Sequence, residues 1–158
     1  MTKEIVKKDV TSELLASRIE EAGYEVEVEE DGDVSILNTG FNTRIEVFED
    51  SGILRFRAAI VLSPNSANQD VESLVAELNK RIFLPKFVYH RWDDGDLAIF
   101  AHHIIYFPFG LNVPNLLFGL RRFLEGVAGA RTDFVKDTAF DPNFVGTKPA
   151  LAAPEQVQ

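Results

Sequence analysis

The strongest constraint on the fold is a set of six short segments in which apolar residues alternate with polar ones or form brief runs. Such segments, rich in Val, Ile, Phe and Tyr, are typical of β-strands. Gly, Asn, Asp or Pro residues bound the segments, and these residue types favour the turns that join strands. The predicted strands are 24–29, 34–37, 41–48, 53–62, 86–92 and 97–107.

Three further segments have apolar residues at the three- and four-residue spacing of an amphipathic helix. Capping, glycine and proline signals set the ends of each helix. The first helix spans 10–22 after a cap at Asp9 or Thr11, the second spans 66–84 from a capping box at Ser66–Gln69, and the third spans 112–129 and stops at Gly129.

The order of these elements, α-β-β-β-β-α-β-β-α, predicts an α+β fold in which helices pack on an antiparallel β-sheet. A chain of 158 residues has the length of one domain. We expect an N-terminal extension at 1–9, the domain at 10–136, and a flexible or docked C-terminal tail at 137–158. Phe140 and Phe144 are the candidate anchors of that tail.

The distribution of charge argues against a nucleic-acid partner. The net charge is -9, and residues 1–50 hold 14 acidic and 5 basic side chains. Binding to phosphates needs clustered Lys and Arg, but the tight basic pairs are confined to Lys7-Lys8, Lys80-Arg81 and Arg121-Arg122. We therefore expect no nucleic acid among the partners.

The chain has no Cys, which excludes disulfides, thiolate nucleophiles and Cys-ligated metals. The first ten residues lack the apolar core of a secretory signal, and no later run reaches the ~20 apolar residues of a membrane helix. The expected location is the cytoplasm, without a membrane partner.

Three histidines, His90, His102 and His103, lie near three aspartates and suggest a metal site. The aspartates are Asp93, Asp94 and Asp96. A two-residue turn at Asp94-Gly95 would place His90 opposite Ile99, and His102 would then face away from His103. His90 would share a face with His103 at a separation of about four residues, roughly 13 Å. No two of these imidazoles could then share an ion, because nitrogen ligands must lie ~2 Å from it. We expect no metal and no cofactor.

No nucleophile elbow, zincin, Walker or Rossmann pattern occurs in the chain. The remaining nucleophiles are Ser, Thr, Lys and carboxylates without a recognisable catalytic setting. The protein is therefore not expected to be an enzyme.

The hairpin at 86–107 is apolar on both faces. An antiparallel sheet usually leaves one face in water, so the second face needs a helix, the tail, a second subunit or a ligand to cover it. Coverage of both faces by the three helices of the chain itself is the alternative. The residues that we expect to contact a partner are Phe87, Tyr89, Trp92, Phe100 and Tyr106.

Several stretches between residues 10 and 128 resemble the YbjN family of bacterial proteins. They are Ser12–Leu15, Ala22–Val26, Asp50–Arg57, Val75–Arg81 and Asp94–Leu97. The resemblance implies a fold similar to that of type III secretion chaperones. It also implies a role in sensory transduction or stress regulation, and a dimer that holds an extended partner segment in an apolar groove.

Three functional hypotheses follow. The first is a non-enzymatic, chaperone-like homodimer that binds a protein partner or peptide segment in stress or signalling regulation. The alternative is a small-molecule or metal-responsive sensor or enzyme that uses a pocket on the sheet. A purely structural subunit of a larger assembly is the third.

Overall fold

The computed structural model describes residues 3–61, 70–95 and 97–136. The helices are α1 (Ser12–Glu21), α2 (Val71–Arg81) and α3 (Val113–Lys136), with a short 3-10 helix η1 (Lys7–Asp9). The strands are β1 (Glu4–Ile5), β2 (Val26–Val28), β3 (Val34–Ile36), β4 (Asn42–Phe48), β5 (Ile53–Val61), β6 (Lys86–Arg91), β7 (Leu97–Tyr106) and β8 (Leu111–Asn112). The predicted α+β fold and element order are confirmed, with β1, η1 and β8 as additions.

Six strands form one antiparallel sheet in the order β2-β3-β4-β5-β7-β6. The first four strands form a meander, and α2 connects β5 to the hairpin β6–β7. The short strands β1 and β8 pair separately, and the buried Ile5 of β1 lies opposite Leu111. The domain boundaries at residues 10 and 137 stay predictions, and the tail with Phe140 and Phe144 lies outside the described residues.

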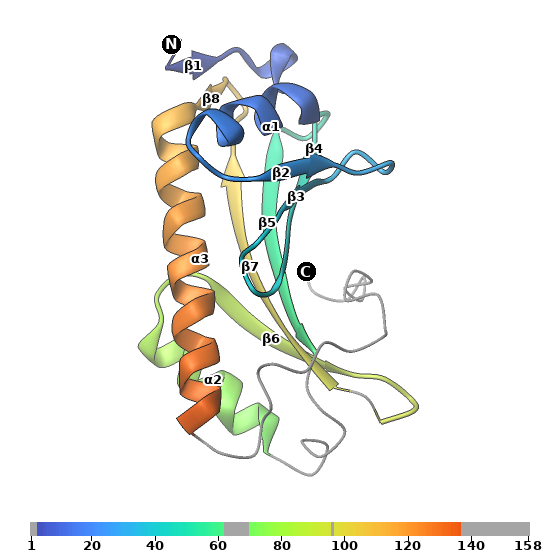
Figure 1. Ribbon diagram of the computed structural model, residues 1–158, viewed down its shortest axis with the longest axis vertical. Coiled ribbons are helices and arrows are strands. Elements are labelled where there is room, and N and C mark those ends of the chain that lie inside the picture. The colour runs from blue at the N-terminus through green and yellow to red at the C-terminus, as the bar shows by residue number, and fades with distance from the viewer. Residues whose placement is uncertain (1–2, 62–69, 96, 137–158) are drawn as a thin grey trace.

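All three helices pack on the same face of the six-stranded sheet. Figure 1 shows α3 running along the length of β5 and β7, with α1 near one end of the sheet and α2 near the other. Each helix contributes its apolar stripe to one continuous core, for example Ile19 of α1, Leu78 of α2 and Phe123 of α3. Alternation along β5 directs Leu54 and Phe56 into this core and leaves the intervening residues on the opposite face.

Side-chain caps begin the helices. Thr11 accepts a hydrogen bond from the Leu14 amide, which confirms one of the two predicted caps of α1. Asp70 caps α2 by accepting from Ser73, so α2 begins at Val71, and the predicted capping box at 66–69 lies outside the described residues. The predicted stop of the third helix at Gly129 is wrong: α3 continues to Lys136, because a single helical glycine costs only ~1 kcal/mol.

The hairpin β6–β7 has a register one residue away from the predicted one. His102 pairs with Lys86 and not with Phe87. The amide of Gly95 donates to the Trp92 carbonyl, so the turn spans four residues and Gly95 follows its centre at a φ of +92°. A shift of one residue exchanges the two faces of a strand. The helix-covered side therefore receives Phe87 and Tyr89, and the opposite side receives Val88 and His90.

The outer edge of the sheet at β6 is closed by a side chain of α2. The Asn79 carboxamide donates to the Phe87 carbonyl at 2.9 Å and accepts from the Phe87 amide at 2.8 Å. One side chain thus satisfies both backbone groups of an edge residue, as a neighbouring strand would.

Replacing Asn79 with Ala should lower the free energy of unfolding by about 1–3 kcal/mol, because Phe87 would lose both edge partners. Urea denaturation followed by circular dichroism measures the change. Asn115→Ala, at an exposed position of α3, is the matched control and should change stability little. Equal stabilities for the two variants would contradict this role of Asn79.

A close approach of α3 to the segment before β6 depends on a glycine. A Cβ atom added at Gly126 would lie 2.5 Å from Pro85 Cδ and still closer to the Leu84 carbonyl oxygen. By contrast, a Cβ atom at Gly129 would meet nothing within 4 Å. The two glycines of one helix therefore differ in the space around them.

Alanine at these two positions should act in opposite directions. Gly129→Ala should stabilise the protein by about 0.5–1 kcal/mol, the usual gain for a helical glycine. Gly126→Ala should destabilise it by about 1–3 kcal/mol, because the helix would have to move away from Leu84 and Pro85. Thermal unfolding of both variants tests the packing, and a stabilised Gly126→Ala variant would disprove it.

Candidate binding surface

The sheet face away from the helices is the candidate functional surface, and we call it the open face. No helix in the described part of the chain packs on it. Strand alternation and register assign its residues. They are Glu27, Ser35, Asn42, Arg44, Glu46, Phe48, Ile53, Arg55, Arg57, Ala59, Lys86, Val88, His90, Ala98, Phe100, His102, Ile104 and Tyr106.

One end of the open face exposes large apolar side chains. Phe48 is 42% exposed, Ile104 39% and Tyr106 69%. Ile53 of β5 lies between Phe48 on β4 and Tyr106 on β7 in the register, so the four residues are neighbours. The guanidinium of Arg55 lies 5.5 Å from the centre of the Phe48 ring. We call Phe48, Ile53, Ile104 and Tyr106 the apolar end.

A nearly buried ion cluster lies beside the apolar end. Glu46 of β4 pairs with both Arg55 and Arg57 of β5, with 3.2 Å between Glu46 Oε1 and Arg57 Nη1. Burial lowers the pKa of Arg57, and Glu46 opposes that shift. The hydrogen bond from Arg55 to Glu46 raises the pKa of Arg55. The arginines stay charged, and their orientation is held by a shared carboxylate.

The hairpin β2–β3 brings a second set of charges to the sheet. Arg44 of β4 lies 3.2 Å from an Asp31 oxygen, 3.5 Å from Asp33 and 3.9 Å from Glu29. Burial and the neighbouring Asp31 raise the pKa of Asp33, and Arg44 counteracts them. Three acidic side chains of the hairpin thus share one arginine of β4, in addition to the backbone pairing of β3 with β4.

The histidines do not converge. His102 lies on the open face between Arg57 and Lys86, and its pKa is lowered by burial and by Arg55. His103 faces the helices, with its ring 5.9 Å from that of Phe56, and burial lowers its pKa as well. The ring of His90 packs edge-on against Trp92. Within the described residues no group of three or more His, Asp or Glu side chains could hold a metal ion.

The five residues expected to contact a partner do not form one surface. Phe87 is 2% exposed in the main core, and Tyr89 lies on the helix-covered side. Phe100 is 1% exposed in a small cluster with Ala59 and Ala98, against which Val88 and Trp92 pack. Of the five residues, Tyr106 is the one that lies on the open face and is strongly exposed.

Sequence reasoning did not single out most contributors to this surface. They are Phe48, Ile53 and Ile104 of the apolar end, and Glu46, Arg55 and Arg57 of the ion cluster. The signal for Ile104 was its alternation with Tyr106, because residues two apart in a strand share a face. The contribution of β4 could not be read without its register to β5, which places Phe48 and Glu46 on this face.

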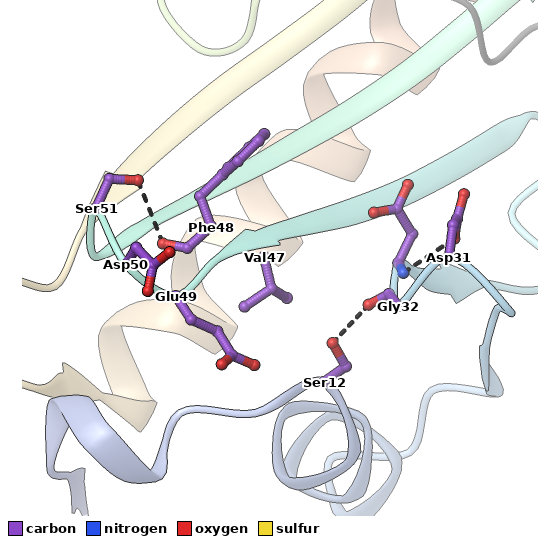
Figure 2. A pocket seen from close by; sticks show the side chains of 9 residues that line it. Ser12, Asp31, Gly32, Val47, Phe48, Glu49, Asp50 and Ser51 are labelled. Atoms are coloured by element: carbon purple, nitrogen blue, oxygen red, sulfur yellow. Dashed lines mark hydrogen bonds between the residues drawn. The ribbon is translucent and has the colours of Figure 1, made fainter.

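A pocket lies at the end of the sheet near α1 (Figure 2). It is open to solvent and has a volume of about 520 Å³ between the start of α1, the β2–β3 turn and the β4–β5 turn. At the edge of the pocket, Ser12 donates to the Gly32 carbonyl. The acidic groups that line the pocket are Asp31, Asp33, Glu49 and Asp50. These groups form no metal-holding cluster and no pair of nucleophile and base.

None of the described helices combines the length and apolarity that a membrane span requires.

Comparisons with known proteins agree with this architecture. The family model of YbjN, described as "Putative bacterial sensory transduction regulator", matches residues 11–134. The crystal structure of YbjN from E. coli, "a putative transcription regulator", matches with a TM-score of 0.74 at 13% identity, covering 87% of this chain and 99% of that chain. An uncharacterized protein from Methanothermobacter thermautotrophicus matches with a TM-score of 0.56 at 12% identity, covering 82% and 99% of the two chains. No curated protein sequence matches this chain.

The two structural matches show a shared fold, because their sequence identities are low. The match to the family model is stronger evidence of kinship, since residues 11–134 include α1, α2 and the whole six-stranded sheet. The chain therefore belongs to the YbjN family, which its sequence had resembled.

Proposed function

We propose that this protein is a non-enzymatic, cytoplasmic regulator that acts by binding another protein through the open face. The observation that carries the proposal is the apolar end, where Phe48, Ile104 and Tyr106 are exposed on a face that no described helix covers. The description of the family as a sensory transduction regulator supports a regulatory role. The proposal includes that the protein acts as a chaperone-like homodimer.

The chemistry of the open face suits a protein partner. Protein interfaces combine apolar and aromatic anchors with Arg, and their polar groups must keep hydrogen-bond partners when water leaves. Glu46 already orients Arg55 and Arg57, so these arginines need little ordering on binding. The guanidinium of Arg55 is 29% exposed and has five donors, so donors in addition to those used by Glu46 can serve a partner.

A catalytic role finds less support. His102 lies on the open face beside the ion cluster, and its neighbours Arg55 and Arg57 share Glu46. A general base needs an orienting group and a site for a reacting atom, and this arrangement is one of mutual charge neutralisation. The acidic pocket of Figure 2 does not favour the small-molecule or metal alternative either, for the reasons given above.

Substituting the apolar end should remove protein binding without unfolding the domain. We expect Ile104→Ser combined with Tyr106→Ser to lose specific partners in covalent cross-linking of cells followed by mass spectrometry. Phe118→Ser is the matched control, because Phe118 is 62% exposed on α3. The control should capture the same proteins as the unmodified chain.

Circular dichroism should show equal folding of both variants, because all three side chains are partly in water. Identical sets of captured proteins for the open-face variant, the control and the unmodified chain would refute the proposal.

A further inference from the structure

The part of the open face that solvent reaches is smaller than the face itself. Ala59, Ala98 and Phe100 are 7% exposed or less, so the end of the face near the β6–β7 turn is closed within the chain. Toward the opposite end a contiguous set of side chains remains at least partly exposed, and we call it the accessible group. Its members are Phe48, Arg55, His102, Ile104, Tyr106 and Lys86.

The accessible group changes from apolar to basic along the strands. One cross-strand row consists of Phe48, Ile53 and Tyr106. In the next row Arg55 lies opposite Ile104, and in the row after that His102 lies opposite Lys86. Rows on one face are two residues apart, so each step covers about 7 Å. A ligand that spans the group therefore meets apolar side chains at one end and cations at the other.

The basic part of this surface holds more cations than carboxylates. The described residues of β5, β6 and β7 direct Arg55, Arg57 and Lys86 to the open face, and none of acidic type. Glu46 of β4 is the carboxylate that both arginines share. Lys86 is exposed and forms no ion pair with the residues that the structure describes. The surface is therefore locally positive, although the chain has a net charge of -9.

His102 lies in the middle of these cations. Arg57 is its neighbour on β5, and Lys86 is its neighbour on β6. Burial lowers the pKa of His102, and the charges of Arg55 and His103 lower it further, so the neutral ring is favoured. A carboxylate beside the ring would favour the protonated form, which has one more donor. Binding of an anion and protonation of His102 are thus coupled.

We propose that the accessible group binds an acidic segment of a partner protein, in which a carboxylate contacts Arg55, His102 and Lys86 while a neighbouring apolar side chain packs on the apolar end. This inference rests on the proposed function and adds the chemistry of the partner. Cations form charge-assisted hydrogen bonds with carboxylates. The apolar end supplies the burial that exposed ion pairs lack.

The charge of the whole chain restricts the partner to a few local negative charges. A polyanion such as nucleic acid extends beyond the accessible group, where the net charge of -9 repels it. One carboxylate, or two close together, matches the local excess of cations over Glu46. The proposed partner is therefore a protein segment that carries Asp or Glu beside apolar residues.

A pair of short peptides tests this chemistry. Every second side chain of an extended peptide lies on the same face, at the spacing of about 7 Å that the rows have. The probe is acetyl-Phe-Ser-Leu-Ser-Glu-amide, and its counterpart ending in Gln is the control. NMR titration of the full chain should shift signals of Lys86, His102 and Ile104 with the Glu peptide. The Gln peptide should bind about tenfold more weakly.

Substitution of Lys86 tests the place of the carboxylate. Lys86→Glu should weaken binding of the Glu peptide on the order of tenfold, whereas Lys86→Arg should retain most of the affinity. Lys8→Glu, an exposed position on η1, is the matched control and should bind as the unmodified chain does. Circular dichroism should show equal folding of the three variants, because both lysines are exposed.

The pH dependence tests the role of His102. Between about pH 7.5 and about pH 5.5 the affinity for the Glu peptide should rise several-fold, because His102 gains a proton while the peptide carboxylate stays ionised. His102→Gln should remove this dependence. His90→Gln should keep it, because His90 lies opposite the buried Ala98 at the closed end of the open face.

Three results would overturn the inference. Equal affinities for the Glu and Gln peptides, or binding of neither, would exclude recognition of a carboxylate. Full affinity of Lys86→Glu would exclude this part of the surface. A pH dependence that survives in His102→Gln would exclude the histidine. Loss of captured proteins by the Ile104 and Tyr106 variant would still support the proposed function in each case, so the two failures are distinguishable.

Discussion

The packing of all three helices on one face of the sheet determines most of what the protein presents to its surroundings. The main core lies between that face and the helices, with Leu54, Phe56 and Phe123 near its centre. The opposite face consequently carries the rest of the strand residues in the described part of the chain. Its composition, and not a cleft, is the source of the functional proposal.

The open face combines features that a plain solvent-facing sheet does not need. Glu46 and Arg57 are nearly buried although they belong to the outer face, and they neutralise each other. A surface ion pair in full solvent contributes little, whereas one that loses water on association must be paired beforehand. The pairing by Glu46 and the exposure of Tyr106 therefore both suit a surface that a protein covers.

Much of the fold could be predicted from the sequence, because local signals agree with one another. Apolar alternation predicted the six strands of the sheet, and helical spacing predicted three helices. Register was less accessible: the Asp94-Gly95 pair is typical of a two-residue turn, but Gly95 closes a longer one. The error exchanged Phe87 for Val88 on the open face. Phe87 is buried because the helices pack on its side of the sheet, and no local sequence pattern specifies that side.

The contact surface was the least predictable part for the same reason. Whether an apolar strand residue is core or surface depends on which side receives the helices, and the sequence does not state that side. Trp92 and Phe100 are conspicuous by residue type, yet they pack against each other. Methyl NMR with a soluble paramagnetic agent tests the central claim directly. The account predicts an Ile104 methyl signal that is strongly relaxed in dilute protein, while the signal of core Ile99 is protected. An Ile104 methyl group protected even in the most dilute sample would contradict it, because the chain itself would then cover the open face.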